Sequence, residues 1–299
     1  MANDNYGEIG SFGGGNIRPV KRKYTIIQSL WTQPIKKERL RDTMFLCALS
    51  LAYAKRNGYK VRMHTDSKGF SLLKGFGYDR LYRTLDAIPD SVPTDLFAAG
   101  KFYAMKAEGV TGKVHIDVDV FIKKPYLIDF FYEDKTVDAI CQMEEDMPLV
   151  DHSDKTFHMH VLGYPPTTRP NWVGSMNTGI VGFNNKELAE KYVNNYFSAL
   201  KMYTAEKLDK YKQENGCKRL AFDFVLEQIE LSYLSVGYNV YALLPTKNVR
   251  AAANILGYQH LQGGRKWSNE EQEKLKSLLI GIDRNLYLVA ARAALNAMK

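Results

Sequence analysis

The stretch Lys113-Val-His-Ile-Asp-Val-Asp-Val-Phe-Ile122 is the segment around which the predicted fold is organised. Its β-branched, apolar composition is typical of a buried strand. Asp117 and Asp119 interrupt that run, although Asp is depleted in strands and a buried carboxylate is costly unless it is paired or bound to a cation. Side chains at positions i and i+2 of an extended segment project to the same side, so we expect the two carboxylates to converge.

This pair of aspartates has two interpretations. Two carboxylates held close together repel each other, and a divalent cation removes that repulsion. The alternative is a half-exposed strand with both aspartates on its solvent face, because short motifs often occur by chance. Only the remaining motifs of the chain distinguish the two interpretations.

Length and composition describe an ordinary globular chain. Its 299 residues suit one large α/β domain or two small ones, and its contents of 45% hydrophobic and 25% charged residues are normal for such domains. The formal net charge of +8 favours anionic partners such as nucleotides, nucleic acid or acidic membrane surfaces, without choosing among them.

The cysteines and the hydropathy pattern bear on the compartment. Cys47, Cys141 and Cys217 lie far apart without a C-x-x-C pair, so the sequence predicts neither a zinc site nor a disulfide framework, and we expect a cytoplasmic location. No apolar run approaches the roughly 18 residues that a membrane-spanning helix needs, and the N-terminus has no apolar signal region. Peripheral contact with a membrane and oligomer formation both stay open.

The first half of the chain predicts a parallel sheet. Tyr24–Trp31 and Tyr59–Thr65 have strand composition, and the helical pattern Arg39–Arg56 separates them. A strand, helix and strand of this length imply a right-handed crossover and a parallel pair. Because ligands collect beyond the carboxyl ends of such strands, Asp66 is expected at the site together with the two aspartates.

The later elements continue this alternation of helices and strands. The patterns predict helices over Thr94–Glu108, Lys186–Tyr211, Arg219–Leu234 and Asp283–Met298, a helix capped by Ser268, one strand over Lys113–Ile122, and strands over Val137–Met143, Ile180–Phe183 and Asn239–Leu244. We expect a flexible, Gly-rich basic arm over residues 1–23, one domain over residues 24–267, and a C-terminal helical segment over residues 268–299 that packs on the domain or on an oligomer partner.

Several polar residues admit both a functional and a structural interpretation. The irregular stretch Glu144–Pro170 is typical of a functional loop, and its His158 and His160 are either ligands or exposed loop residues. Trp172 either stacks on a ligand or belongs to the core. Asp223 and Glu227, four residues apart on one helix face, are either solvated or close to a reacting centre.

Taken in order, these motifs resemble GT-A nucleotide-sugar glycosyltransferases, and their layout is closest to glycosyltransferase family eight. The resemblance covers about residues 24–267. It implies a Rossmann-like GT-A fold of class α/β, with a mixed, mostly parallel sheet, helices on both of its faces, and one site at its carboxyl edge.

The resemblance assigns roles residue by residue. The metal-binding Asp-x-Asp of that family matches Asp117-Val118-Asp119, and its C-terminal His-x-x-Gly-x-x-Lys-Pro-Trp matches His260, Gly263, Lys266 and Trp267, with the proline missing. The implied metal ligands are Asp117, Asp119 and His260. The implied donor-binding residues are Asp66, Lys101, Asp117, Asn177, Gly263 and Lys266. Lys101 matches a basic residue of the family's upstream helix, and Asn177 matches the Asn-x-Gly motif that touches the donor sugar. Asp66 is expected to contact the nucleoside because of its position alone.

One segment departs from the family pattern. The catalytic-face Asp-Gln-Asp is not reproduced in Arg219–Glu227; Asp223 takes one acidic position and Phe222 falls where a polar residue is expected. The catalytic residues are therefore expected to be Asp223, Glu227 and Asn177, and this departure leaves the stereochemistry of transfer open.

The expected function is metal-dependent transfer of a sugar from a nucleotide-diphosphate donor, a UDP-sugar, to an unknown acceptor that is a saccharide, protein, lipid or nucleic acid. The resemblance implies a hexosyltransferase of the retaining type, while the departure in Arg219–Glu227 leaves retention and inversion both open. Two carboxylates and an imidazole suit Mn²⁺, with Mg²⁺ as the alternative cofactor. The competing hypotheses are a catalytically silent GT-A-like binding or structural module, and a transferase that acts on a nucleic-acid acceptor.

Overall fold

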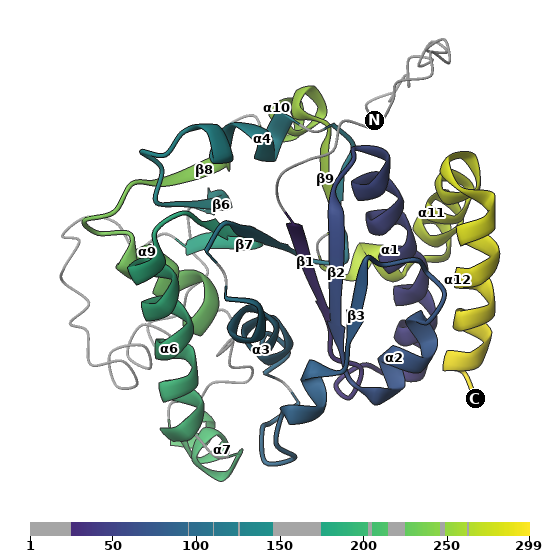
Figure 1. The fold of residues 1–299 in the computed structure, drawn as a ribbon. Helices are drawn as coiled ribbons and strands as arrows, with labels where there is room; N and C mark the ends of the chain where they lie inside the picture. Colours follow the sequence, from purple (N-terminus) through teal and green to yellow (C-terminus); the bar gives the residue numbers. More distant parts are fainter. Residues whose placement is uncertain are drawn as a thin grey trace, which may run out of the picture.

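The protein forms a mixed seven-stranded sheet covered by helices on both faces (Figure 1). The computed structural model describes residues 25–94, 96–109, 111–124, 126–145, 175–202, 205–214, 225–245, 249–261 and 263–299. The strands are β1 (Thr25–Leu30), β2 (Lys60–Thr65), β3 (Arg80–Tyr82), β4 (Lys113–Ile116), β5 (Val120–Ile122), β6 (Ala139–Glu145), β7 (Ser175–Phe183), β8 (Val240–Leu244) and β9 (Tyr258–His260).

The order of the strands in the large sheet is β3-β2-β1-β4-β7-β6-β8. β1 pairs in parallel with β2 and β4, β2 with β3, and β6 with β8, whereas β7 is antiparallel to both β4 and β6. The mostly parallel α/β sheet predicted from the sequence is confirmed. β5 and β9 form a separate two-stranded antiparallel sheet, which we call the ribbon.

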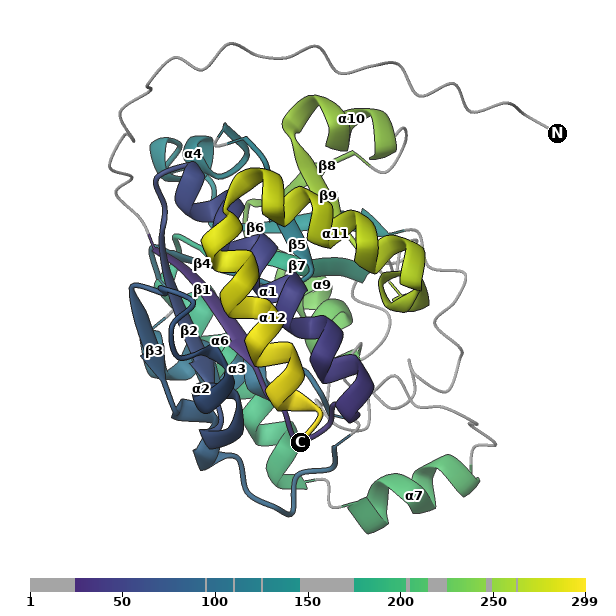
Figure 2. The same cartoon turned by 90° about the vertical axis from the view of Figure 1, so that its right-hand side faces the viewer.

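Two groups of helices cover the two faces of the sheet (Figures 1 and 2). The helices are α1 (Lys37–Arg56), α2 (Ser67–Leu73), α3 (Ala99–Glu108), α4 (Tyr126–Glu133), α6 (Lys186–Met202), α7 (Ala205–Glu214), α9 (Glu230–Leu234), α10 (Val249–Leu256), α11 (Asn269–Ile282) and α12 (Arg284–Ala297), with the short helical turns η1 (Thr84–Ala87), η2 (Val225–Ile229) and η3 (Gly263–Trp267). Helices α1, α2, α11 and α12 share one buried core, and α3, α6 and α9 share the other.

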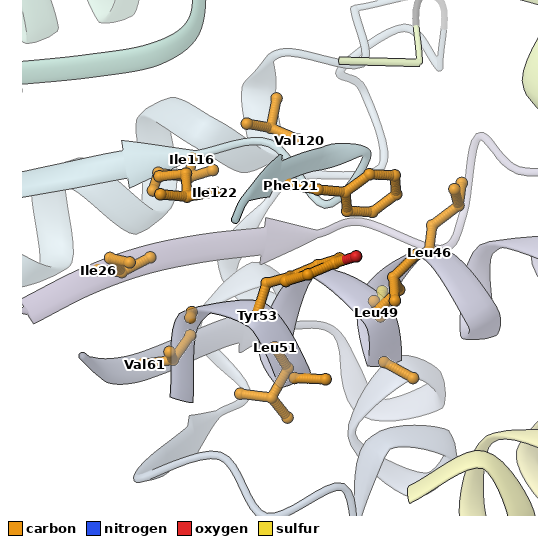
Figure 3. Packing of buried hydrophobic residues seen from close by; sticks show 14 of the residues in the cluster. Ile26, Leu46, Leu49, Leu51, Tyr53, Val61, Ile116, Val120, Phe121 and Ile122 are labelled. Atoms are coloured by element: carbon orange, nitrogen blue, oxygen red, sulfur yellow. The ribbon is translucent and has the colours of Figure 1, made fainter. Parts of the chain in front are cut away.

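The ribbon is held against α1 by large apolar side chains. Phe121 of β5 is fully buried beside Tyr53 of α1, with ring centroids 6.3 Å apart (Figure 3). Burying an aromatic side chain of this size stabilises the fold by about 1.5–3 kcal/mol. This packing fixes the position of the chain directly after the two aspartates.

The expectation of one strand over Lys113–Ile122 is wrong. The chain leaves the large sheet after β4, turns at Asp117–Asp119 and enters the ribbon as β5. The backbone N–H of Val120 donates to the carbonyl of Asp117 across the turn at 3.0 Å. The apolar run hides this change, because residues on both sides of the turn are buried. The two carboxylates therefore converge from a turn and not from the pleat of one strand.

Other expected boundaries also need correction. The helix predicted to start after Thr94 starts at Ala99, and its N-cap residue, Ala98, makes no side-chain capping bond. The strand predicted over Ile180–Phe183 starts earlier, at Ser175, so that Asn177 lies inside β7. The predicted helix Lys186–Tyr211 is divided into α6 and α7. The sequence reasoning missed α2, β3, α4, α10 and β9, which are all short.

The C-terminal helices complete the layer over α1. The hydroxyl of Ser268 accepts from the N–H of Glu271 at 3.2 Å, which confirms the predicted cap of α11. The buried residues Leu275, Leu279 and Ala290 belong to the same core as α1. No described helix is both long enough and apolar enough to span a membrane.

Candidate metal and donor site

A cavity of about 540 Å³ opens beyond the carboxyl ends of β1 and β4. Its lining includes four carboxylates, Asp117, Asp119, Glu145 and Glu227, against two ammonium groups, those of Lys101 and Lys266. The acidic excess corresponds to two charges, the charge of one divalent cation. The apolar part of the wall is formed by residues such as Trp31, Ile35, Leu46, Phe97, Val118 and Trp267.

Three side chains of this cavity can hold a metal ion together. Asp117, Asp119 and His260 each offer one ligand atom, and these atoms lie within 4.8 Å of one another. The backbone fixes them: the N–H of Asp117 donates to the carbonyl of Gly179 at 2.9 Å, and the N–H of Leu261 donates to the carbonyl of Asp119 at 3.1 Å. Two carboxylates and an imidazole are a mixed oxygen and nitrogen set that fits Mn²⁺ or Mg²⁺.

The orientation of His260 also fits a metal ligand. Its Nδ1 lies 2.8 Å from Oε1 of Gln142, and its Nε2 lies 3.4 Å from Oδ1 of Asp119. With a cation bound, a neutral His260 that donates from Nδ1 to Gln142 would present its Nε2 lone pair to that cation. Gly179 makes room for this pair, because a Cβ there would stand 2.3 Å from Oε1 of Gln142 and 2.9 Å from Cε1 of His260.

Lys101 is the buried cation of the site. Its ammonium donates to the carbonyl of Thr178 at 2.9 Å, lies 3.0 Å from Oδ1 of Asp117 and pairs with Glu227. Burial lowers the pKa of Lys101, but the carboxylates of Asp117 and Glu227 outweigh it and raise that pKa above its ordinary value. The lysine is therefore charged, and it joins the first metal ligand to the acid expected to be catalytic.

Glu227 comes from η2, a turn of π-helix, a distortion that is frequent at functional sites. Its carboxylate accepts from the hydroxyl of Thr178, and its backbone carbonyl accepts from the hydroxyl of Tyr192 at 2.9 Å. These contacts hold a buried acid at the wall of the cavity.

The surroundings of the two aspartates shift their pKa values in opposite directions. Burial raises the pKa of Asp117 to about 6, and the charges of Glu227 and Asp119 contribute in the same direction against Lys101. Burial also acts on Asp119, but hydrogen bonding to His260 and the ammonium of Lys266 outweigh it and hold the pKa of Asp119 well below its usual range. Both carboxylates are largely ionised at neutral pH, as cation binding requires.

Asn177 lines the cavity, but its amide is engaged by the protein. Its Nδ2 donates to Oε1 of Glu145 at 2.8 Å, and its Oδ1 accepts from the N–H of Gly179 at 3.0 Å. The amide therefore orients Glu145, the last residue of β6, which the sequence reasoning did not single out.

Asp66 has a structural role in the described chain. It caps α2 by accepting from the N–H of Gly69 at 2.8 Å, and it accepts from the N–H of Thr32 at 2.7 Å. The residues that line the cavity do not include Asp66. Its predicted contact with a nucleoside stays a prediction.

The site residues predicted from the sequence include some that line the cavity and some that lie outside the described residues. Those that the fold brings to the cavity are Lys101, Asp117, Asp119, Asn177, Glu227, His260, Gly263 and Lys266. Asp223, His158, His160 and Trp172 lie outside the described residues. The sequence reasoning missed Gln142, Glu145, Thr178 and Gln228, since no short motif marks them.

Comparisons with known proteins give a family and a set of distant structural likenesses. The family described as "Family of unknown function (DUF6734)" matches residues 24–280. No curated protein matches the sequence.

Solved structures similar to this chain include several glycosyltransferases. For galactosyltransferase LgtC in complex with donor and acceptor sugar analogs, the identity is 10%, the TM-score is 0.40, and the match covers 87% of this chain and 96% of that one. For mouse xyloside xylosyltransferase 1, the identity is 12%, the TM-score is 0.38, and the match covers 76% of this chain and 86% of that one. For the glycosyltransferase GlyE of Streptococcus pneumoniae, the identity is 12%, the TM-score is 0.44, and the match covers 93% of this chain and 64% of that one.

Proposed function

We propose that this chain, which belongs to the DUF6734 family of unknown function, is a metal-dependent glycosyltransferase that uses a nucleotide-sugar donor. The observation that carries the proposal is the grouping of Asp117, Asp119 and His260 within 4.8 Å in a cavity that also contains Lys101 and Lys266. The proposal is supported by the described residues that match family-eight motifs, because they lie far apart in the sequence and line the same cavity.

Asp117, Asp119 and His260 would hold Mn²⁺ or Mg²⁺. When bound, the cation neutralises negative charge on a departing diphosphate. The acidic excess of the cavity supports this assignment, because buried carboxylates without a counter-charge are costly. The cavity of about 540 Å³ lies within the range of about 300–1,000 Å³ that is usual for small-molecule sites.

The diphosphate of the donor is assigned to Lys266 and Gly263. The ammonium of Lys266 lies at the metal group, 2.5 Å from Oδ2 of Asp119. The exposed Gly263 has a φ of +66°, a conformation that suits glycine and permits close approach of a ligand to the backbone. We take the donor to be a UDP-sugar and place the nucleoside along the apolar wall near Leu46 and Trp267.

The reaction breaks the bond between the anomeric carbon of the sugar and the β-phosphate oxygen. It forms a bond from that carbon to the oxygen of an acceptor hydroxyl group, whose proton passes to the departing diphosphate. Lys266 would stabilise the nucleoside diphosphate that leaves. Glu227, with Asp223 as its expected partner, would face the sugar, and Asn177 would act by holding Glu145. Hexosyl transfer with retention follows from the family-eight resemblance.

A thermal-shift titration with UDP, with and without Mn²⁺, tests the binding site. Beyond any stabilisation by Mn²⁺ alone, we expect a further stabilisation by UDP that needs Mn²⁺ and that is lost on chelation and in Asp117→Asn. Asp90→Asn, which changes an exposed carboxylate in a turn outside the cavity, is the matched control and should behave as the wild type. The absence of any shift with UDP or another nucleoside diphosphate in the presence of Mn²⁺ would contradict the proposal.

Turnover separates the enzyme from a silent module. A transferase should release UDP slowly from a UDP-sugar by hydrolysis even without an acceptor, and that release should stop in Asp119→Asn. Metal-dependent UDP binding without release from any of several UDP-sugars would favour a binding module instead.

A further inference from the structure

Two lysines of the cavity pair with the candidate metal-ligand carboxylates, and they differ in how far they are buried. Lys101 is buried in α3 and has three partners. Lys266 belongs to η3, no residue of which is buried, and its side chain is 21% exposed. The ammonium of Lys266 pairs with Asp119 and lies 5.3 Å from the centroid of the Trp267 ring.

Lys266 occupies one side of a carboxylate that the metal site needs. It pairs with Oδ2 of Asp119, while Oδ1 of the same carboxylate faces Nε2 of His260 at 3.4 Å. A cation held by Oδ1 and Nε2 would stand close to the ammonium group. Two positive charges at such a separation repel each other, so a bound cation disfavours the contact between Lys266 and Asp119.

Open space borders the turn that carries Lys266. A Cβ placed on Gly263 or Gly264 would have no described heavy atom within 4 Å. By contrast, Lys101 is enclosed by Thr178 and Glu227 and has no such freedom. Of the two cations, Lys266 is therefore the one that can leave its carboxylate.

We propose that Lys266 is an internal counter-ion that competes with the divalent cation for Asp119 and turns to the diphosphate once the cation has bound. This inference rests on the proposed function and adds an order to it: cation first, nucleotide second. Before the cation binds, the ammonium is engaged by a carboxylate and is less available to an anionic ligand. Afterwards the same ammonium is released beside the metal site, where the diphosphate is expected.

The test measures Mn²⁺ affinity by isothermal titration calorimetry without nucleotide. Lys266→Met should bind Mn²⁺ more tightly than the wild type, by a factor on the order of ten for one partly exposed like charge. The same variant should bind UDP in the presence of Mn²⁺ more weakly. Arg265→Met is the matched control, because it removes one positive charge from the same turn but from a side chain that pairs with Glu271.

A second pair of variants tests the release of the lysine. Asp119→Asn frees Lys266, so UDP binding without Mn²⁺ should become stronger than in the wild type. Asp117→Asn removes the same charge but leaves the pair of Lys266 and Asp119 intact, so it should have a smaller effect.

The outcomes separate this inference from the proposed function. If the wild type binds Mn²⁺ and Lys266→Met binds it equally or more weakly, the counter-ion role is wrong and the proposed function stands. If neither protein binds Mn²⁺, the metal site and the inference both fail. If Arg265→Met strengthens Mn²⁺ binding as much as Lys266→Met, net charge explains the effect and the inference is overturned.

Discussion

Replacing Gly179 by Ala tests whether packing around His260 sets the metal affinity. The added methyl group would stand 2.3 Å from Oε1 of Gln142 and 2.9 Å from Cε1 of His260, where about 3.4 Å or more is comfortable. Either side chain has to move, and the 2.8 Å contact between Nδ1 of His260 and Gln142 is lost. Overpacking of a filled site costs about 1–3 kcal/mol of unfolding free energy.

The effect on metal binding follows from the same contact. The partner of a ligating histidine typically contributes a factor of about 10–100 in metal affinity, which corresponds to about 1.4–2.7 kcal/mol. We expect Gly179→Ala to weaken Mn²⁺ binding by such a factor in a calorimetric titration, and to lower the unfolding free energy in urea. Gln142→Leu removes the same hydrogen bond from the other side, so the two changes should be non-additive when combined.

The control glycine is Gly281 of α11, where a Cβ would meet no described heavy atom within 4 Å. Gly281→Ala should bind Mn²⁺ as the wild type does and should be slightly more stable, because Ala is favoured over Gly in a helix. Unchanged Mn²⁺ affinity in Gly179→Ala would refute the reasoning, since His260 would then either not be a ligand or not depend on Gln142.

Two further predictions concern buried ionisable groups. Lys101→Met leaves Glu227 and Asp117 without the ammonium group that they share, so it should lower the unfolding free energy in urea by about 3–5 kcal/mol. Added Mn²⁺ should restore part of this loss. A loss below about 1 kcal/mol would contradict this ion pairing. Burial and the charge of Lys101 hold the pKa of His115 well below its ordinary value, so the unfolded chain takes up a proton below pH 6.5 that the folded chain does not. The contribution of His115 to the unfolding free energy is therefore fully present above about pH 6.5 and is lost as the pH falls, by about 1.4 kcal/mol at pH 5.5. In urea unfolding at pH 7.5 and 5.5, His115→Gln should lose this part of the pH dependence. An unchanged pH dependence would show that His115 is not its cause.

Local patterns predicted those parts of the fold that depend on local chemistry. The helix α1 and the strands β1 and β2 have clear periodicity and appear within two residues of their predicted bounds. The predicted Ser268 cap is also present, because the oxygen that it supplies acts within its own turn. Short elements such as β3 and β9 were missed, since a three-residue strand has too few side chains to show a period.

The site was predicted where a motif marks it and missed where only tertiary contact creates it. Asp117, Asp119 and His260 were found because two acids in an apolar run and a downstream His-x-x-Gly need an explanation. Gln142 was not found, since an amide within a strand has no signature, and its function depends on His260, which follows 118 residues later. Asn177 was assigned to the donor sugar from its motif; it lines the cavity and its amide donates to Glu145, and its contact with a sugar stays a prediction.

The position of the two aspartates explains why they come together with His260 although the single-strand prediction was wrong. Asp117 is tied to the large sheet through Gly179 of β7, whereas Asp119 is tied to the ribbon through Leu261, next to His260. The carboxylates thus stand where the chain passes from one sheet to the other, and a cation between them would join the two sheets. A single strand would have kept both aspartates on one sheet and left His260 without a fixed relation to them. The turn at Asp117–Asp119 is therefore what allows residues so far apart in the sequence to form one candidate metal site.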